Sequence, residues 1–134
     1  MDIIFKFWQK FQDYNSDYKN YRIPQSYYFC NNKKDADECL NLVTNGIKRA
    51  TSSSLWWYIK NEERLPKLGD LSIVTNWEGQ PSAIIKVTDV TIVKFKDITE
   101  EYAFIKGEGD KSLKYWKKVH LEYYKEEVKS YNEF

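Results

Sequence analysis

The chain has little cysteine and almost no histidine, and this scarcity limits the kinds of site that it can build. Its two cysteines, Cys30 and Cys39, are nine positions apart, and His120 is the only histidine. A disulfide-stapled fold or a zinc site needs more thiol and imidazole groups at closer spacing. We therefore expect two reduced thiols, no metal and no cofactor.

Long apolar runs are also missing. The first residues, MDIIFKFWQKFQ, carry an aspartate and lysines where a secretory signal needs an uninterrupted apolar segment. No stretch approaches the ~20 apolar residues that cross a bilayer. These absences predict a cytoplasmic protein with no membrane partner.

Charge of one sign is not in excess, because 21 basic side chains face 20 acidic ones. A protein that coats nucleic acid by its overall field needs a much larger positive charge. Any nucleic-acid partner would therefore have to be held by a defined site.

Aromatic residues, in contrast, make up 17% of the chain. Most of these rings are expected in the core, which leaves some for stacking on flat ligands.

The length of 134 residues predicts a single domain over 1–134, with 1–34 as an N-terminal helix and irregular aromatic segment and 35–134 as the core. Periodicity and capping signals predict helices at 2–14, from Asp35 to Asn45-Gly46, around 55–58, after Thr99, and at 111–129. Strands are predicted at 71–76 and 82–95, joined by a hairpin at Glu78-Gly79, and 47–52 could enter another. This order predicts an α+β fold around a small, mostly antiparallel sheet or barrel.

The first candidate site is the segment from Gly46 to Thr51. The glycine permits a sharp turn, after which Lys48 and Arg49 project to opposite faces of an extended chain. Lys48 suits a phosphate contact or, with its pKa lowered by burial, activation of the Thr51 hydroxyl as a nucleophile. The simpler alternative is a solvated lysine beside a strand threonine.

Two further segments could carry chemistry. In Gly107-Glu108-Gly109-Asp110 the glycines allow amides to converge on an anion, and Glu108 could act as acid or base. The alternative is a tight turn with a helix cap at Asp110.

In the last helix, the lysines suit contact with a nucleic-acid backbone, and Tyr115 and Trp116 suit stacking on bases. Plain amphipathicity, with Trp116 and His120 in the core, is the alternative there.

Three stretches in this order resemble the ASCH domain family of the PUA-like superfamily. They are Leu42-Val43-Thr44-Asn45-Gly46-Ile47-Lys48-Arg49-Ala50-Thr51, Leu65-Pro66-Lys67-Leu68-Gly69-Asp70, and Gly107-Glu108-Gly109-Asp110-Lys111-Ser112-Leu113 with Trp116 and His120. The similarity covers about residues 35–124. It implies a small, mostly antiparallel β-barrel with surrounding helices, a cleft at the Gly-x-Lys motif, and an association with RNA.

Some members of this family cleave RNA or deacetylate a modified cytidine. In the deacetylating members a lysine and a threonine three residues later carry the chemistry, and Lys48 and Thr51 match them. The family's glutamate falls on Lys106, which reverses the charge and removes the acid/base group. Glu108, two residues on, could replace it. Similar chains continue into a closing strand, whereas this one stops at Tyr131-Asn132-Glu133-Phe134, so an open barrel edge could pair with a second copy.

Three functions follow from these observations. The first is an RNA- or nucleotide-binding domain, the second a hydrolase acting on RNA or acetylated cytidine through Lys48, Thr51 and Glu108, and the third a protein-interaction module without a nucleic-acid role. The binding function would use the following residues: Lys48, Arg49, Ser52, Tyr58, Lys106, Tyr115 and Trp116.

Overall fold

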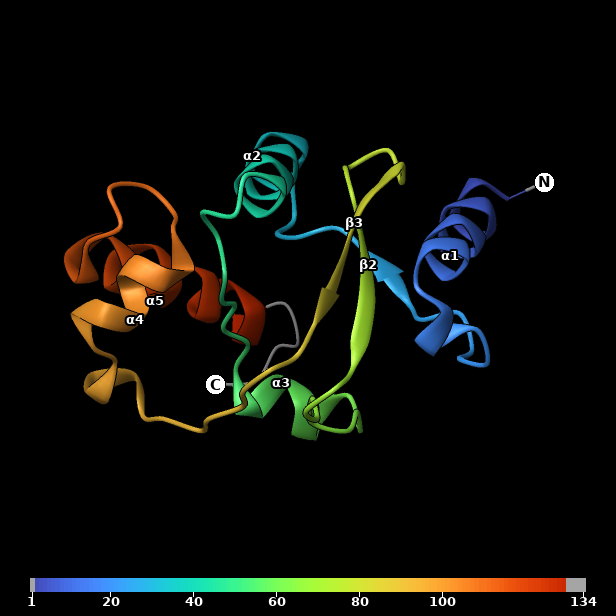
Figure 1. The fold of residues 1–134 in the computed structure, drawn as a ribbon. Coiled ribbons are helices and arrows are strands. Elements are labelled where there is room, and N and C mark those ends of the chain that lie inside the picture. Colours follow the sequence, from blue (N-terminus) through green and yellow to red (C-terminus); the bar gives the residue numbers. More distant parts are fainter. Residues whose placement is uncertain (1, 130–134) are drawn as a thin grey trace. The chain divides into compact units, whose positions relative to one another are not determined.

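The computed structural model describes residues 2–129 and divides the chain into two compact units. Of the described residues, 2–44 and 67–89 form what we call the sheet unit, and 45–66 and 90–129 form the helical unit. The sheet unit contains α1 (Ile3–Tyr14), β1 (Ser26–Tyr27), α2 (Lys33–Thr44), β2 (Leu71–Thr75) and β3 (Pro81–Lys86). The helical unit contains α3 (Leu55–Lys60), α4 (Glu100–Lys106) and α5 (Leu113–Lys129) (Figure 1).

The two helices of the sheet unit begin at side-chain caps. The Asp2 carboxylate accepts a hydrogen bond from the Ile4 amide at 2.9 Å, which starts α1 close to the predicted position. The Asn32 side chain accepts one from the Asp35 amide at 2.9 Å. Helix α2 therefore begins at Lys33, two residues before the cap predicted at Asp35. Trp8 anchors α1 in the core with 2% of its surface exposed.

The sheet has three strands in the order β1-β2-β3, with β1 parallel and β3 antiparallel to β2. Ile73 and Val74 of the central strand are fully buried. The hairpin after β2 closes through a hydrogen bond of 3.0 Å from the Asn76 amide to the Gln80 carbonyl. Strand β2 and the hairpin confirm the prediction made for 71–80.

The prediction of a long strand at 82–95 is wrong beyond Lys86. The last ladder bonds join Val87 to Asp70 and Gly69, where the chain of β2 turns away at 67–70. Among the described residues, no strand pairs with the segment after Val87, which has no regular hydrogen bonding, and Ile92 is 66% exposed. The segment 47–52 likewise forms no strand.

The predicted closed barrel is also wrong for the described residues, which form an open sheet. Closure requires hydrogen bonding to return from the last strand to the first. In the part of the chain that the structure describes, β1 has only two residues and β3 pairs with β2 alone, so this sheet has two edges. The expected α+β class is correct. The segment 131–134, on which the open-edge prediction depends, lies outside the described residues.

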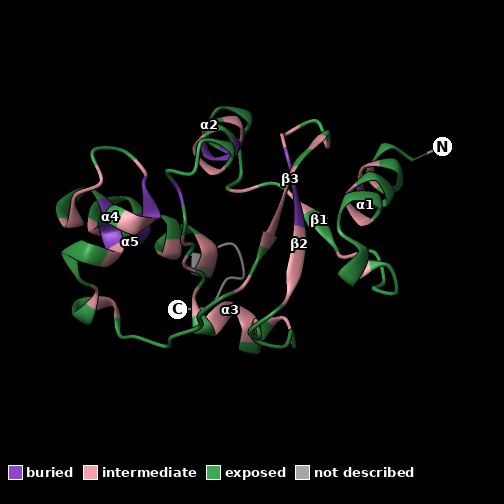
Figure 2. Cartoon of the chain, in the orientation of Figure 1, coloured by how far each residue is buried: buried purple, intermediate pink, exposed green. Residues whose placement is uncertain are grey.

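The helical unit is built on α4 and α5, which pack together. Thr99 caps α4 by accepting a hydrogen bond from the Tyr102 amide at 3.1 Å, as predicted, and Gly107 ends it in the left-handed conformation at φ 76°. Ser112 caps α5, since its hydroxyl accepts from the Tyr115 amide at 3.0 Å. Buried residues gather where these two helices meet (Figure 2). Among residues 2–129, no helix is both long and apolar enough to span a membrane.

Candidate functional site

Four buried or half-buried polar side chains meet inside the helical unit: Lys48, Lys106, Glu108 and His120, which we call the Lys-Glu-His cluster. The Lys106 ammonium lies 2.8 Å from the Glu108 carboxylate and 2.9 Å from Nε2 of His120. The Lys48 ammonium lies 3.8 Å from the same carboxylate oxygen. Both lysines are at most 5% exposed, so this is not an ordinary solvated ion pair.

A glycine brings Lys48 and Glu108 together. A β-carbon on Gly107 would lie 2.5 Å from the Ile47 carbonyl oxygen, closer than real side chains approach. The next backbone contact is a hydrogen bond of 2.9 Å from the Arg49 amide to the Ile105 carbonyl. The segment 47–49 thus lies directly against the end of α4, and the turn that follows carries Glu108 to the Lys48 ammonium.

His120 is a neutral hydrogen-bond acceptor in this cluster. An ammonium can only donate, so Nε2 must accept from Lys106, and the ring proton sits on Nδ1, 2.9 Å from the Trp116 carbonyl. Burial, and next the positive charge of Lys106, lower the pKa of His120 to about 4. At neutral pH the imidazole therefore holds the Lys106 ammonium in place.

Glu108 is the member of the cluster with access to solvent, because its side chain is 20% exposed while those of Lys48 and Lys106 are 3% and 5% exposed. Both buried ammonium groups lie within 4 Å of the same carboxylate oxygen. Lys48 also donates to the Ala50 carbonyl at 2.7 Å, which fixes the direction of its ammonium. The cluster therefore presents a held carboxylate that can accept hydrogen bonds.

Hydroxyl groups lie along the chain next to Lys48. The Tyr102 hydroxyl donates to the Thr51 carbonyl at 2.9 Å and lies 2.6 Å from the Ser52 hydroxyl, which must then be the donor in that pair. Ser54 caps α3 through the Trp57 amide at 3.1 Å, and its hydroxyl donates to Glu127. These bonds hold 51–54 in one conformation beside α4 and α5.

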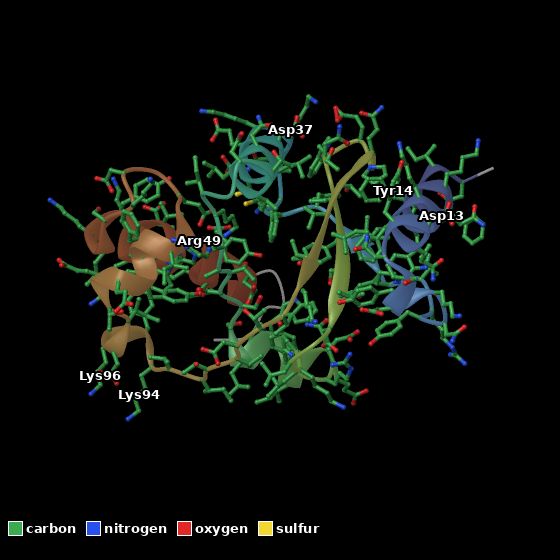
Figure 3. The ribbon with its side chains drawn as sticks, in the orientation of Figure 1. Asp13, Tyr14, Asp37, Arg49, Lys94 and Lys96 are labelled. Atoms are coloured by element: carbon green, nitrogen blue, oxygen red, sulfur yellow. The ribbon has the colours of Figure 1, made fainter. Side chains whose placement is uncertain are left out.

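The structure brings some of the predicted site residues together and separates others. Lys48, Lys106 and Glu108 meet, and the alternative of a solvated Lys48 is wrong because this side chain is buried. The structure places Arg49 and Thr51 on the surface (Figure 3 labels Arg49), with Ser52 half-buried. Lys106, expected to contact nucleic acid, is instead bonded to Glu108 and His120.

The predicted stacking aromatics differ in exposure. Trp116 is only 3% exposed and stacks on His120 with ring centres 4.2 Å apart, so it cannot accept a base in this conformation. The alternative of Trp116 and His120 as core residues is confirmed. Tyr115 is 37% exposed and Tyr58 is half-buried, which leaves these two as candidates for stacking.

Sequence reasoning missed Tyr102 and the bond between Lys106 and His120. The sequence places Tyr102 three residues after the cap Thr99, but its contact with Ser52 joins residues that are far apart in the sequence.

A shallow hollow of about 340 Å³ lies elsewhere, in the sheet unit between α1 and β3. It is lined by Phe7, Lys10, Phe11, Tyr14, Asn15, Ser82, Ala83 and Ile84.

Comparison with known proteins gives a consistent result. A family model described as ASCH domain matches residues 25–134. The crystal structure of an ASCH domain from Lactobacillus crispatus JV V101 is 30% identical in sequence with a TM-score of 0.92, covering 99% of this chain and 85% of that one. A structure from Enterococcus faecalis V583, assigned to family DUF984, is 33% identical with a TM-score of 0.88, covering 97% and 77%. No curated protein matches.

Proposed function

Because the chain belongs to the ASCH domain family, we propose that it binds RNA or a nucleotide at the surface formed by Glu108, Arg49 and the segment 51–52. The observation that carries this proposal is the held carboxylate of Glu108, fixed at 2.8 Å from one buried ammonium and 3.8 Å from another. A preorganised acceptor of this kind suits the amino and imino groups on the edge of an unpaired base.

Residues that follow Lys48 in the chain, together with two tyrosines of the same unit, would supply the other contacts that single-stranded RNA needs. Arg49 is exposed and can reach phosphate, while the hydroxyls of Thr51 and Ser52 suit phosphate or the ribose 2′-hydroxyl. Tyr115 and Tyr58 are candidates for stacking. Lys106 has a different role in this proposal, because its two hydrogen bonds orient Glu108 instead of contacting phosphate.

The net charge of +1 makes the salt dependence of binding informative. Each phosphate contact contributes about one unit to the slope of log K against log salt. A site with Arg49 as its main exposed cation should show a slope of about one or two. A steep slope would instead point to binding by a diffuse cationic surface.

Fluorescence anisotropy with a labelled single-stranded RNA tests the site. Arg49→Gln should weaken binding by about five- to tenfold and lower the salt slope by about one. Lys94→Gln and Lys96→Gln are matched controls, since both side chains are exposed cations of the same unit that project outward (Figure 3). Equal effects of all three substitutions would contradict the proposal and indicate a diffuse cationic surface. No binding by the native chain would also contradict it and would favour a protein-interaction module.

Glu108→Gln tests the carboxylate separately from the phosphate contact. This substitution preserves shape but removes the charge, so binding of a base-containing ligand should weaken while the salt slope stays unchanged. A mononucleotide and inorganic phosphate can be compared by calorimetry. If Glu108→Gln weakens both equally, base recognition by this carboxylate is wrong.

A second candidate function, hydrolysis of acetylated cytidine or RNA, is favoured by the distance of 3.8 Å between Lys48 and Glu108. Lys106 stands where the resemblance places a glutamate, yet its ammonium brings the Glu108 carboxylate next to Lys48. Lys48 would then polarise the nucleophile, Thr51 or a water, and Glu108 would transfer the proton.

Self-association is a separate proposal, because an open edge of the sheet can pair with the edge of a second copy.

Product analysis separates this function from binding alone. Acetylated cytidine and a single-stranded RNA are incubated with the native chain, Thr51→Ala and Glu108→Gln, and the products are resolved by liquid chromatography. Turnover lost in both variants would support hydrolysis with Thr51 as nucleophile. Turnover kept in Thr51→Ala but lost in Glu108→Gln would assign the attack to water. Binding without turnover would reject the enzyme.

A further inference from the structure

The two cysteines, whose spacing predicted no pairing, lie close together in the sheet unit. The sulfur atoms of Cys30 and Cys39 are 3.7 Å apart and are not joined by a disulfide. A disulfide bond is about 2.05 Å long, so bond formation requires the sulfurs to approach by less than about 2 Å.

The two thiols differ in exposure and in the stiffness of their surroundings. Cys39 is 4% exposed and lies within α2, between the buried residues Ala36 and Leu40. Cys30 is exposed, in the loop that joins β1 to α2. An oxidant can therefore reach Cys30, while Cys39 is positioned behind it.

Neighbouring contacts hold the loop in the conformation that brings Cys30 to Cys39. The Cys30 backbone has φ 66°, in the left-handed region that favours glycine. On one side the Tyr28 ring packs on Trp77 with centres 4.6 Å apart, and on the other the Asn32 side chain caps α2. These contacts therefore keep the two thiols close together although a cysteine disfavours the left-handed backbone conformation at residue 30.

We propose that Cys30 and Cys39 are a reversible oxidation site, at which a peroxide converts the two thiols into an intramolecular disulfide. The Cys30 thiol gives its proton to solvent, the thiolate attacks one peroxide oxygen, and the O–O bond breaks. The hydroxide that leaves takes up a proton from solvent, so a sulfenic acid and one water form. The Cys39 sulfur then attacks Sγ of Cys30, the S–S bond forms, the S–O bond breaks, and a second water leaves with the proton of Cys39. Two thiols are oxidised and one peroxide is reduced.

The disulfide would link the loop before α2 to the middle of that helix. The closed ring spans only residues 30–39, and crosslinking removes conformational freedom from the unfolded chain. We therefore expect the oxidised protein to unfold at a temperature several degrees higher than the reduced one. A small dithiol such as dithiothreitol reverses the reaction by thiol–disulfide exchange.

The test uses the full chain at low concentration, treated with dilute hydrogen peroxide and followed by maleimide labelling of thiols and intact mass. The native chain should lose both thiols, lose two hydrogens in mass, stay monomeric, and recover fully in dithiothreitol. Cys30→Ser should keep its remaining thiol much longer, because Cys39 is buried. Cys39→Ser should instead gain oxygen on Cys30 or form an intermolecular disulfide.

Two measurements keep the test decisive. Thermal unfolding of each reduced variant shows whether it is folded, and Cys39→Ala replaces Cys39→Ser if the buried hydroxyl prevents folding. Oxidation of the native chain to oxygen adducts or to linked dimers, at the rate seen in Cys39→Ser or Cys39→Ala, would overturn the proposal. So would a mass loss of two hydrogens with no change in unfolding temperature on reduction.

Discussion

Gly107 has no β-carbon. Both the folding of the helical unit and the geometry of the candidate site depend on the space that this leaves. Gly107 ends α4 at φ 76°, and a β-carbon there would meet the Ile47 carbonyl oxygen at 2.5 Å. Gly46 provides the matched control. Its φ is 72°, in the same unit, and a β-carbon on it would have nothing within 4 Å.

The two substitutions to alanine separate backbone strain from close approach. An alanine in the left-handed region costs about 1 kcal/mol, which is the whole effect expected for Gly46→Ala. In Gly107→Ala the contact with Ile47 adds about 1–3 kcal/mol of overpacking, for a total of about 2–4 kcal/mol. For a chain of this size, 1 kcal/mol shifts the midpoint of thermal unfolding by about 4 °C.

Thermal and urea unfolding of the native chain and both variants measure this difference. We expect the midpoint to fall by about 4 °C for Gly46→Ala and by about 8–16 °C for Gly107→Ala. RNA binding should also weaken in Gly107→Ala below its unfolding temperature, because the turn that carries Glu108 must move away from Ile47. Equal destabilisation by the two substitutions would refute the argument from close approach.

Three further predictions follow from single groups. The pKa of His120 is lowered to about 4, so the folded state resists its protonation. Stability should be full above about pH 6.5 and fall by up to about 3 kcal/mol as pH decreases towards 4, and urea unfolding of His120→Gln against pH should show a shallower decrease. Tyr102→Phe removes the hydrogen bonds to Ser52 and to the Thr51 carbonyl. It should lower the unfolding free energy by about 1–2 kcal/mol and increase hydrogen exchange at 51–54; unchanged exchange would contradict this role. Trp8→Ala should cost about 3–5 kcal/mol in urea unfolding, since this ring is almost fully buried, and a cost below 1 kcal/mol would show that α1 does not anchor the core.

Local signals in the sequence identified the helices because helix boundaries depend on neighbouring residues. Thr99 caps α4 as its spacing predicted, and Asn45-Gly46 follows the end of α2 at Thr44. Where two candidate caps lie close together, spacing does not decide between them, and Asn32 caps α2 ahead of the predicted Asp35. The ordered motifs around Lys48 and Glu108 also identified the family correctly.

Strand length and site geometry were decided by contacts between distant residues. The segment after Lys86 has the composition of a strand, but no strand among residues 2–129 pairs with it. Pairing, not composition, satisfies the backbone groups of a sheet. Likewise, spacing showed that Lys106 replaces a glutamate but not that its ammonium would bond to His120 and Glu108. Periodicity along one helix fixes the face on which a side chain lies. The partner of that side chain is fixed only when another segment packs against the same face. For this reason only the tertiary structure brought Lys48 close to Glu108 and Cys30 close to Cys39.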